Sequence, residues 1–457
     1  MFIRRPTARS GNTFALVLWI GAVWLTGDRI AVAATTIPNT PAGHMLSGWL
    51  QAFNSGGRAR IQSFDKTHIP WWSLNQALAA RAWTGGYDLQ SVKSSGTFWI
   101  VFRAREKERS AEIIGSLVVR SYEPGHITLL SLEPASAHSD EVALDGDERA
   151  RVIDGAAKLL NEYYLHPNVA RKVSAKLKAL QRQGRYRGIT DGEIFAVRLS
   201  DDLVALSGDK HIGVDFFAKS MPRRPGPRLH PHPGRLAGGN CGFEKVGHIA
   251  PDIGYLKLSA FANPKYCRRV AISAMNSLAD SDALIIDLRD NHGGAPPMAA
   301  LIASYLFDKP THLDDISYPR TRRTEQLWTN AHLPGKRFIG KPVFVLTSGS
   351  TFSAAEEFAY DLKSLKRATV IGETTGGGAH LVAPHRIDAH YFIRVPFARF
   401  VNPITKANWE GTGVQPDVRT SAADALAVAE KLAAGEITKD KSHRPGTAES
   451  RARNDRF

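Results

Sequence analysis

A serine at the start of a predicted helix is the first residue in this sequence whose position suggests chemistry. In the segment KPVFVLTSGSTFSAAEEFAYDLK an apolar strand ends at Thr347, and Ser353 precedes an amphipathic helix. The first amides of a helix are unpaired and carry partial positive charge, so a nucleophilic Ser353 would find an oxyanion donor in the N–H of Ala354. Serine is also a favoured helix N-cap, and Glu356 three residues later completes a capping box. This segment alone therefore allows both a nucleophile and a cap.

Two adjacent glycines follow another buried strand. In ALIIDLRDNHGGAPP the strand runs into a turn that contains Gly293 and Gly294. Adjacent glycines permit close backbone approach and expose amide groups, so they could supply the other half of an oxyanion hole. The same segment also fits a tight turn held by Asp287 and Arg289, and the two interpretations are compatible.

A histidine and a glutamate supply the groups that a serine nucleophile requires. His211 lies in DDLVALSGDKHIGVDF, between a helix that ends at Gly208 and a short apolar strand, and histidine is the natural general base for serine. Glu410 lies in NWEGTGVQPDV, where its carboxylate would orient the imidazole and stabilise the charged form. The chain has 16 histidines, so neither residue carries the assignment alone.

Alternating strands and helices must position these residues. Continuous apolar strands with helices between them predict an α/β core over residues 241–432, built as a layered sheet covered by helices. Helical apolar periodicity predicts a helical subdomain over 146–216. Helices followed by four β-rich segments predict a small α+β domain over 41–136. The basic stretch 217–240, rich in Pro and Gly, is interpreted as a loop or linker, and the polar segment 433–457 as a disordered tail.

Five segments in a fixed order resemble one peptidase family. They are IGYLKLSAF, ALIIDLRDNHGG, TFSAAEEFAYDLK, VIGETTGGGAH and NWEGTGVQPD. Together they resemble the C-terminal processing (tail-specific) serine peptidases, and in particular the branch with tricorn protease and interphotoreceptor retinoid-binding protein. The resemblance implies a crotonase-like fold of stacked ββα units, with Ser353 as nucleophile, His211 as base and Glu410 as the orienting acid. The segment GWLQAFNSGGRARIQSF loosely resembles NTF2-like domains.

Departures from the family pattern narrow this expectation. Members with a Ser–Lys dyad carry a lysine in the glycine loop that here reads Gly376 to His380, without a lysine. A Ser–Lys dyad is therefore not expected, and His380 in this loop is an alternative base to His211. The tricorn branch has a serine before its histidine, whereas this chain has Lys210. No segment between 207 and 250 resembles a PDZ module, so recognition of a peptide C-terminus is not supported.

The composition bounds the class of protein. The chain has 457 residues, 43% of them hydrophobic, so it is not disordered throughout. A basic start, a short apolar run and an Ala-x-Ala site predict a cleaved signal peptide over 1–33, with no transmembrane segment afterwards and a periplasmic or secreted product. Only two cysteines are present, which excludes a disulfide scaffold but leaves a Cys241–Cys267 bond or two buried thiols open.

The sequence thus predicts an exported serine hydrolase that cleaves peptide or protein substrates through an acyl-enzyme, without a metal or cofactor. The net charge of +15 comes without an aromatic-plus-basic motif, so no nucleic-acid partner is expected. A homo-oligomer is left open. The alternative is a non-catalytic carrier of apolar ligands on the same fold, in which Ser353 is only a cap.

Overall fold

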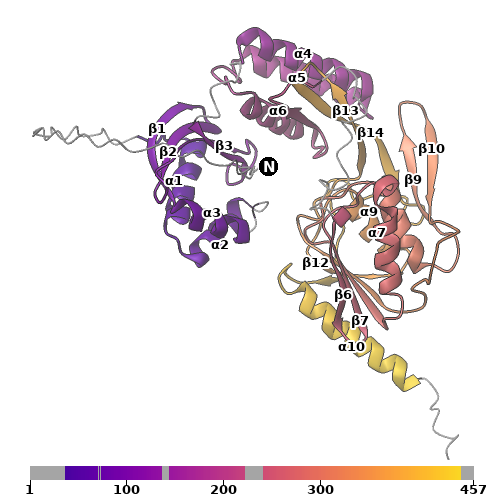
Figure 1. Cartoon of the computed structure of the whole chain (residues 1–457). Helices are drawn as coiled ribbons and strands as arrows, with labels where there is room; N and C mark the ends of the chain where they lie inside the picture. The colour runs from indigo at the N-terminus through magenta and orange to yellow at the C-terminus, as the bar shows by residue number, and fades with distance from the viewer. Residues whose placement is uncertain (1–35, 70–71, 73, 136–143, 222–239, 444–457) are drawn as a thin grey trace, which may run out of the picture. The chain divides into compact units, whose positions relative to one another are not determined.

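The computed structural model describes residues 36–69, 72, 74–135, 144–221 and 240–443 (Figure 1). The predicted signal peptide, most of the basic linker and the end of the tail lie outside the described residues. The chain forms two compact units. The first comprises the described residues up to Gly146 together with Tyr186–Asp201, and the second comprises Asp147–Arg185 and the chain from Asp202 onward. No helix in the described ranges has an apolar stretch long enough to cross a bilayer.

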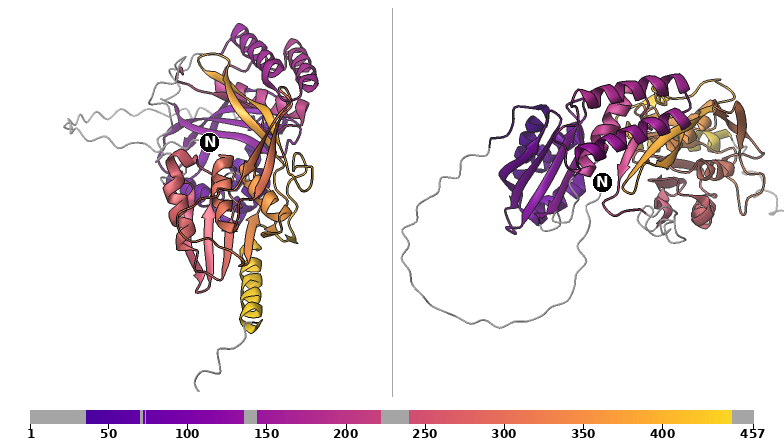
Figure 2. Two further views of the ribbon diagram at one scale, coloured as in Figure 1. Left: turned by 90° about the vertical axis from the view of Figure 1, so that its right-hand side faces the viewer. Right: turned by 90° about the horizontal axis from the view of Figure 1, so that it is seen from above.

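The first unit packs three helices on one face of an antiparallel sheet, shown in indigo and purple in Figures 1 and 2. The helices are α1 (Pro41–Asn54), α2 (Arg58–His68) and α3 (Leu74–Thr84). The strands, in the order β1-β2-β3-β4, are β1 (Tyr87–Ser95), β2 (Trp99–Glu106), β3 (Glu112–Val119) and β4 (Ile127–Pro134). Thr40 caps α1 by accepting the Gly43 N–H at 3.1 Å, and Pro41 fills the first helical position. In this unit three helices thus precede four strands along the chain.

The core of this unit is aromatic. The Trp49 ring stacks on Phe53 and Tyr87 at centroid separations of 5.3 and 5.7 Å, and Phe53 stacks on Trp72. These rings face buried residues of the sheet such as Phe102. Large aromatic side chains bury much apolar area each, which explains how so small a sheet holds its helices.

The second unit is built on a six-stranded sheet with the order β15-β12-β11-β8-β7-β6. All neighbouring pairs are parallel except β6 with β7. The strands are β6 (Phe243–Ala250), β7 (Ile253–Leu258), β8 (Ala283–Asp287), β11 (Val343–Thr347), β12 (Thr369–Gly372) and β15 (Val418–Arg419). The helices packed on the sheet are α7 (Pro264–Ser277), α8 (Pro296–Ala303), α9 (Ala354–Ser364) and α10 (Ala425–His443). The short 3-10 helix η3 (Ser304–Leu306) follows α8.

Both faces of this sheet are buried, which accounts for its continuous apolar strands. Successive side chains of a strand point to opposite faces, so Ile286 faces the cluster with α7, α8 and α9, while Ile285 faces α10. Ala429, Ala433 and Ile437 of α10 are buried in the second cluster. The predicted disordered tail over 433–457 is therefore wrong for 433–443, where small apolar residues hold the helix on the sheet.

A second sheet and a helical segment complete this unit. The sheet has the order β10-β9-β14-β13, with β5 also paired to β14, and its neighbouring strands are antiparallel. Its strands are β5 (Gly213–Phe216), β9 (His312–Tyr318), β10 (Arg323–Trp328), β13 (His380–Arg386) and β14 (Tyr391–Val401). The helical segment consists of α4 (Gly146–Tyr163) and α5 (Pro167–Arg182) of the predicted subdomain, whereas most of the third subdomain helix, α6 (Gly192–Ser207), belongs to the first unit.

The two cysteines form a disulfide. Cys241 precedes β6 and Cys267 lies in the first turns of α7, and their Cα atoms are 5.8 Å apart. Of the two interpretations that the sequence left open, the bonded one is the one observed. The bond ties the antiparallel edge strand β6 to a helix of the main core.

Candidate active site

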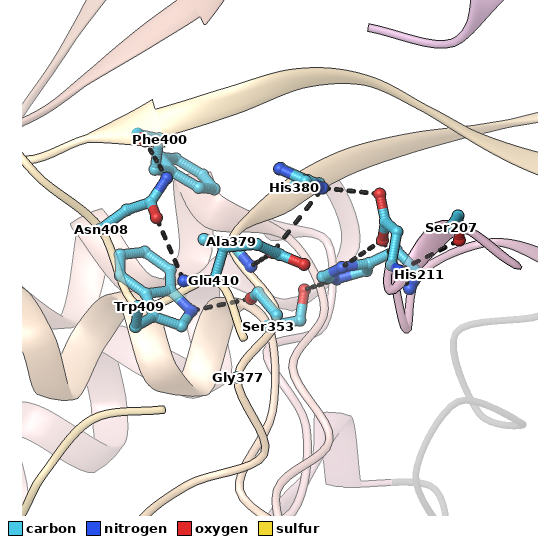
Figure 3. Close-up of polar contacts among 12 residues, drawn as sticks. Ser207, His211, Ser353, Gly377, Ala379, His380, Phe400, Asn408, Trp409 and Glu410 are labelled. Atoms are coloured by element: carbon cyan, nitrogen blue, oxygen red, sulfur yellow. Dashed lines mark hydrogen bonds and ion pairs between the residues drawn. The ribbon is translucent and has the colours of Figure 1, made fainter. Parts of the chain in front are cut away.

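Ser353 occupies a sharp turn between β11 and α9. Its φ of +56° is unusual for a residue with a side chain, and it stands at the N-cap of α9. Its N–H donates to Glu356 Oε2 at 2.9 Å, and its Oγ lies 3.2 Å from His211 Nε2 (Figure 3). Gly293 packs directly against it, because a Cβ on Gly293 would stand 2.7 Å from the Ser353 Cβ. The hydroxyl is thus held at a helix N-terminus and against an imidazole.

His211 reaches Ser353 from the turn between α6 and β5. Its side chain is 6% exposed, its ring packs on Phe352 at 4.7 Å, and its backbone N–H donates to Asp209 Oδ1 at 2.9 Å. Burial lowers the pKa of His211 to about 4, despite the opposing attraction of Asp209. The imidazole is therefore neutral at pH 7 and able to accept a proton from Ser353.

Glu356 connects Ser353 to the glycine loop. Its carboxylate accepts four hydrogen bonds, from the Ser353, Gly377 and Gly378 N–H groups at 2.9, 2.6 and 2.8 Å and from the Thr375 hydroxyl at 2.5 Å. Burial outweighs these bonds and raises its pKa. The capping-box glutamate is therefore also the support of the loop that lies over His211.

The glycine loop lies so close to His211 and Phe352 that a side chain would not fit at Gly378. A Cβ on Gly378 would stand 2.5 Å from His211 Cε1 and 2.3 Å from Phe352 Cζ. Lys210 holds the start of this loop, since its Nζ donates to the Gly376 carbonyl at 2.6 Å. The loop and the imidazole are consequently packed as one assembly.

Glu410 is not placed as the sequence suggested. Its Oε2 accepts the Ala379 N–H at 2.6 Å and lies 3.6 Å from His380 Nδ1. His211 Nδ1 makes no hydrogen bond to any described residue, so the expected Glu410–His211 bond is absent. The physical reason is that the segment around Glu410 braces the glycine loop, where Trp409 Nε1 also donates to the Gly378 carbonyl at 2.7 Å.

Asp209 is the carboxylate nearest to His211. Its Oδ1 lies 3.9 Å from His211 Nδ1, and its Oδ2 accepts hydrogen bonds from the Tyr164 hydroxyl at 3.0 Å and from His380 at 2.7 Å. Burial pushes the pKa of Asp209 up, but the bonds from His380 and from the His211 backbone outweigh it and hold the pKa below its usual value. Asp209 is thus ionised and lies between the two histidines.

His380, the alternative base, points to Asp209 and not to Ser353. Burial lowers its pKa, but the nearby Asp209 and Glu410 carboxylates prevail and raise it. Asp209, His380 and Glu410 offer ligand atoms within 4.8 Å of one another. Their hydrogen bonds to one another, to Tyr164 and to Ala379 already account for this cluster without a metal ion.

The three N–H groups expected to form the oxyanion hole differ in whether they already donate a hydrogen bond. The Gly293 N–H donates to Asn291 Oδ1 at 2.8 Å, so it is already engaged in this structure. Within the described part of the chain, the N–H groups of Gly294 and Ala354 have no hydrogen-bond acceptor. A Cβ on Gly293 would stand 3.0 Å from the Ala354 nitrogen, so the glycine turn packs against the Ala354 N–H as well as against Ser353.

Sequence reasoning missed two important residues. Asp209 stands two residues before His211, in a spacing that lets a carboxylate bind the backbone N–H two residues on, and this Asx-turn pattern was a usable signal. Glu356 was recognised only as a cap. Its bonds to the glycine loop join segments about 20 residues apart, and no local pattern predicts them.

Comparisons with known proteins agree with this geometry. Residues 252–420 match the model of peptidase family S41, and residues 146–232 match the model described as the N-terminal domain of peptidase S41 in eukaryotic IRBP. Together the two models cover more than half of the chain. Residues 252–420 are therefore a domain of peptidase family S41. The S41 match contains Ser353 and the 375–380 loop, and the preceding match contains His211.

Several curated relatives of this S41 chain are named as processing proteases. It is 28% identical over 239 residues to carboxyl-terminal-processing peptidase 2 (chloroplastic) of Arabidopsis thaliana, covering 50% of this chain and 44% of that protein. It is 30% identical over 167 residues to the carboxyl-terminal-processing protease of Synechocystis, covering 36% and 37%. The chain therefore spans less than half the length of these relatives.

Solved structures similar to this chain include mature CPAF and tricorn protease. Mature CPAF aligns with a TM-score of 0.46 and 13% identity, over 63% of this chain and 98% of that one. Tricorn protease aligns with a TM-score of 0.40 and 16% identity, over 77% and 42%.

Proposed function

We propose that this S41 chain is a serine peptidase that cleaves peptide bonds in peptide or protein substrates. The observation that carries the proposal is the 3.2 Å approach of Ser353 Oγ to His211 Nε2 at the N-terminus of α9. In this proposal Ser353 is the nucleophile and His211 the general base. The names of the curated relatives support peptide-bond cleavage as the reaction.

The reaction follows from the positions of these groups. Neutral His211 takes the proton from Ser353 Oγ as the oxygen attacks the substrate carbonyl, and the resulting imidazolium donates that proton to the leaving amine. The Ala354 N–H, together with that of Gly294, stabilises the negative oxygen of the tetrahedral intermediate. Water, deprotonated by the same imidazole, then releases the acyl group from Ser353.

Asp209 takes the role that the sequence assigned to Glu410. When His211 is protonated, its Nδ1–H faces the Asp209 carboxylate, whose Oδ1 is 3.9 Å away in the resting structure. A small rotation of the ring would form a charge-assisted bond and stabilise the imidazolium. Glu410 acts as a positioning residue, because it holds Ala379 and faces His380.

Hydrolysis of an unstructured protein such as casein tests the proposal. Ser353→Ala should lower kcat by at least about 1000-fold, since the nucleophile is lost while the fold is kept. Ser350→Ala is the matched control, because Ser350 lies in the same turn and its hydrogen bonds are made by its backbone. Hydrolysis by Ser353→Ala at the native rate would refute the assignment. Saturable binding of an apolar ligand without any hydrolysis would favour the carrier.

Export is also part of the proposal. The predicted signal peptide supports it, and so does the Cys241–Cys267 disulfide, because such bonds persist in oxidising compartments. The product would be periplasmic or secreted. Sequencing the N-terminus of the purified protein tests this, and a mature chain that starts after Ala33 is expected.

We also propose an NTF2-like fold for the first unit and a crotonase-like fold for the second. The helices α1–α3 on one face of a four-stranded antiparallel sheet support an NTF2-like first unit. The succession of β6, β7 and α7 in the second unit supports stacked ββα repeats of the crotonase-like kind. Gel filtration coupled to light scattering would decide whether the protein forms a homo-oligomer.

A further inference from the structure

Three buried carboxylates lie close together inside the second unit, beside α9. They are Asp314 of β9 and Glu357 and Asp361 of α9, with exposed fractions of 0%, 1% and 2%. One oxygen from each lies within 4.8 Å of the other two. Oxygens bound to one calcium ion at about 2.3 to 2.6 Å each can lie up to about 5 Å apart, so this spacing fits a shared cation.

These carboxylates lack the partners that buried charges require. Neither oxygen of Asp314 and neither oxygen of Glu357 has a hydrogen-bond donor among the described residues. Asp361 accepts a hydrogen bond from Asn402 Nδ2 at 3.1 Å, and it accepts a second from the Asp314 carboxyl group when that group carries a proton. No basic side chain in the described ranges forms an ion pair with any of the three. Buried charges are normally paired or bound to metals, so the cluster lacks a positive charge.

Small side chains of α8 border the two carboxylates of α9. Ala299, Ala300 and Ala303 of α8 line a small hollow together with Glu357 and Asp361. Such a cluster is costly as three free charges, and a bound cation would remove that cost.

We propose that Asp314, Glu357 and Asp361 form a buried site for a divalent cation of the calcium type. Three carboxylates can supply up to six oxygens, and calcium accepts mono- and bidentate carboxylates in flexible geometry. Magnesium fits less well, because it keeps several of its waters, and the α8 side chains beside Glu357 and Asp361 are alanines that offer no polar atom to those waters. Zinc prefers nitrogen and sulfur ligands, which this site does not offer.

The cation would join β9 to the helix that begins at Ser353. Glu357 and Asp361 are four residues apart and so lie on one face of α9, while Glu356 points to the glycine loop. The site would therefore stabilise the second unit and the position of α9. It takes no part in the proton transfers proposed above, so the two proposals are tested separately.

Calcium titration of the full-length protein tests the site. Protein stripped with EGTA should bind one calcium ion per chain in calorimetry, and saturating calcium should raise its Tm by at least about 5 °C. Absence of both calcium binding and a Tm response in the native protein would overturn the proposal.

A variant of unchanged shape separates loss of calcium binding from loss of folding. Asp314→Asn removes one buried charge without changing the shape, so in the stripped state its Tm should be no lower than that of the native protein, while its calcium response is lost. Asp315→Asn is the matched control, because Asp315 is the next residue of β9, is 27% exposed and pairs with His312. A native calcium response in Asp314→Asn, or an equal loss in Asp315→Asn, would contradict the site.

Discussion

The Glu356 carboxylate gives a quantitative test of how the site is held together. Each of its oxygens accepts two hydrogen bonds: Oε1 from Thr375 and Gly377, and Oε2 from Ser353 and Gly378. In Glu356→Gln one oxygen becomes an NH₂ group that can accept none of them. The least costly orientation of the glutamine puts its NH₂ group at the Oε1 position. There the Thr375 hydroxyl can rotate and accept a hydrogen bond from the NH₂ group, but the Gly377 N–H loses its acceptor.

The expected magnitude follows from these lost bonds. Hydrogen bonds to charged groups contribute about 1.5 to 3 kcal/mol each, and removing a buried charge recovers part of this loss. We therefore expect the free energy of unfolding to fall by about 2 kcal/mol. Because Ser353 and the loop over His211 lose their common support, kcat should fall about 100-fold with a much smaller change in KM.

The assay compares two variants of similar stability loss. Urea unfolding gives the free energy, and casein hydrolysis per folded molecule gives kcat and KM. Asp202→Asn is the control, since Asp202 is a buried carboxylate bonded to Arg185 at 2.9 and 3.2 Å. It should be destabilised but fully active. A Glu356→Gln protein that is destabilised yet retains kcat within twofold of native would refute the positioning role.

Three further predictions concern the base, the loop and the disulfide. The kcat/KM profile should rise with an apparent pKa of about 4 and be flat from about pH 5 to 7, because His211 is neutral above its lowered pKa; a rise near pH 6.5 would contradict this. Gly378→Ala should lower kcat at least tenfold at unchanged secondary structure by circular dichroism, because its Cβ would collide with His211. Replacing Cys241 and Cys267 by serine opens a loop of 26 residues and should lower the free energy of unfolding by about 3.5 kcal/mol in urea titrations, and no change would show that the bond does not form.

The burial of His211 also predicts how stability depends on pH. Its pKa is lower in the folded than in the unfolded chain, so its contribution is fully present above about pH 6.5 and is lost as the pH falls toward 4. His380 acts in the opposite direction, since its raised pKa favours the folded state at lower pH and this contribution is lost as the pH rises through that value.

The parallel sheet and its helices could be predicted from the sequence because their signals are local. Strands such as β8 and β11 are short runs of apolar residues, and the helices between them have clear apolar faces. The antiparallel sheet of β9, β10, β13 and β14 was not predicted. Every residue of β10 is exposed or half-buried, and β14 contains Pro396, which weakens a strand signal.

The sequence indicated most of the residues of the site, but not which of their side chains contact one another. Ser353 and His211 meet as expected, with Ser353 at the N-terminus of α9 and His211 in the turn before β5. Glu410 has the right residue type, but its nearest partners depend on how the segment at 408–413 packs against the glycine loop. Asp209, in contrast, was overlooked although it lies beside His211 in the chain.

Covalent labelling of Ser353 tests the central proposal most directly. A fluorophosphonate reacts with serines that are activated by a neighbouring base, and mass spectrometry of the digested protein locates the adduct. We expect a single adduct on Ser353 in the native protein and no adduct in the His211→Ala variant. The Glu410→Gln variant should still be labelled on Ser353. Labelling of another residue, or equal labelling of Ser353 in His211→Ala, would contradict it.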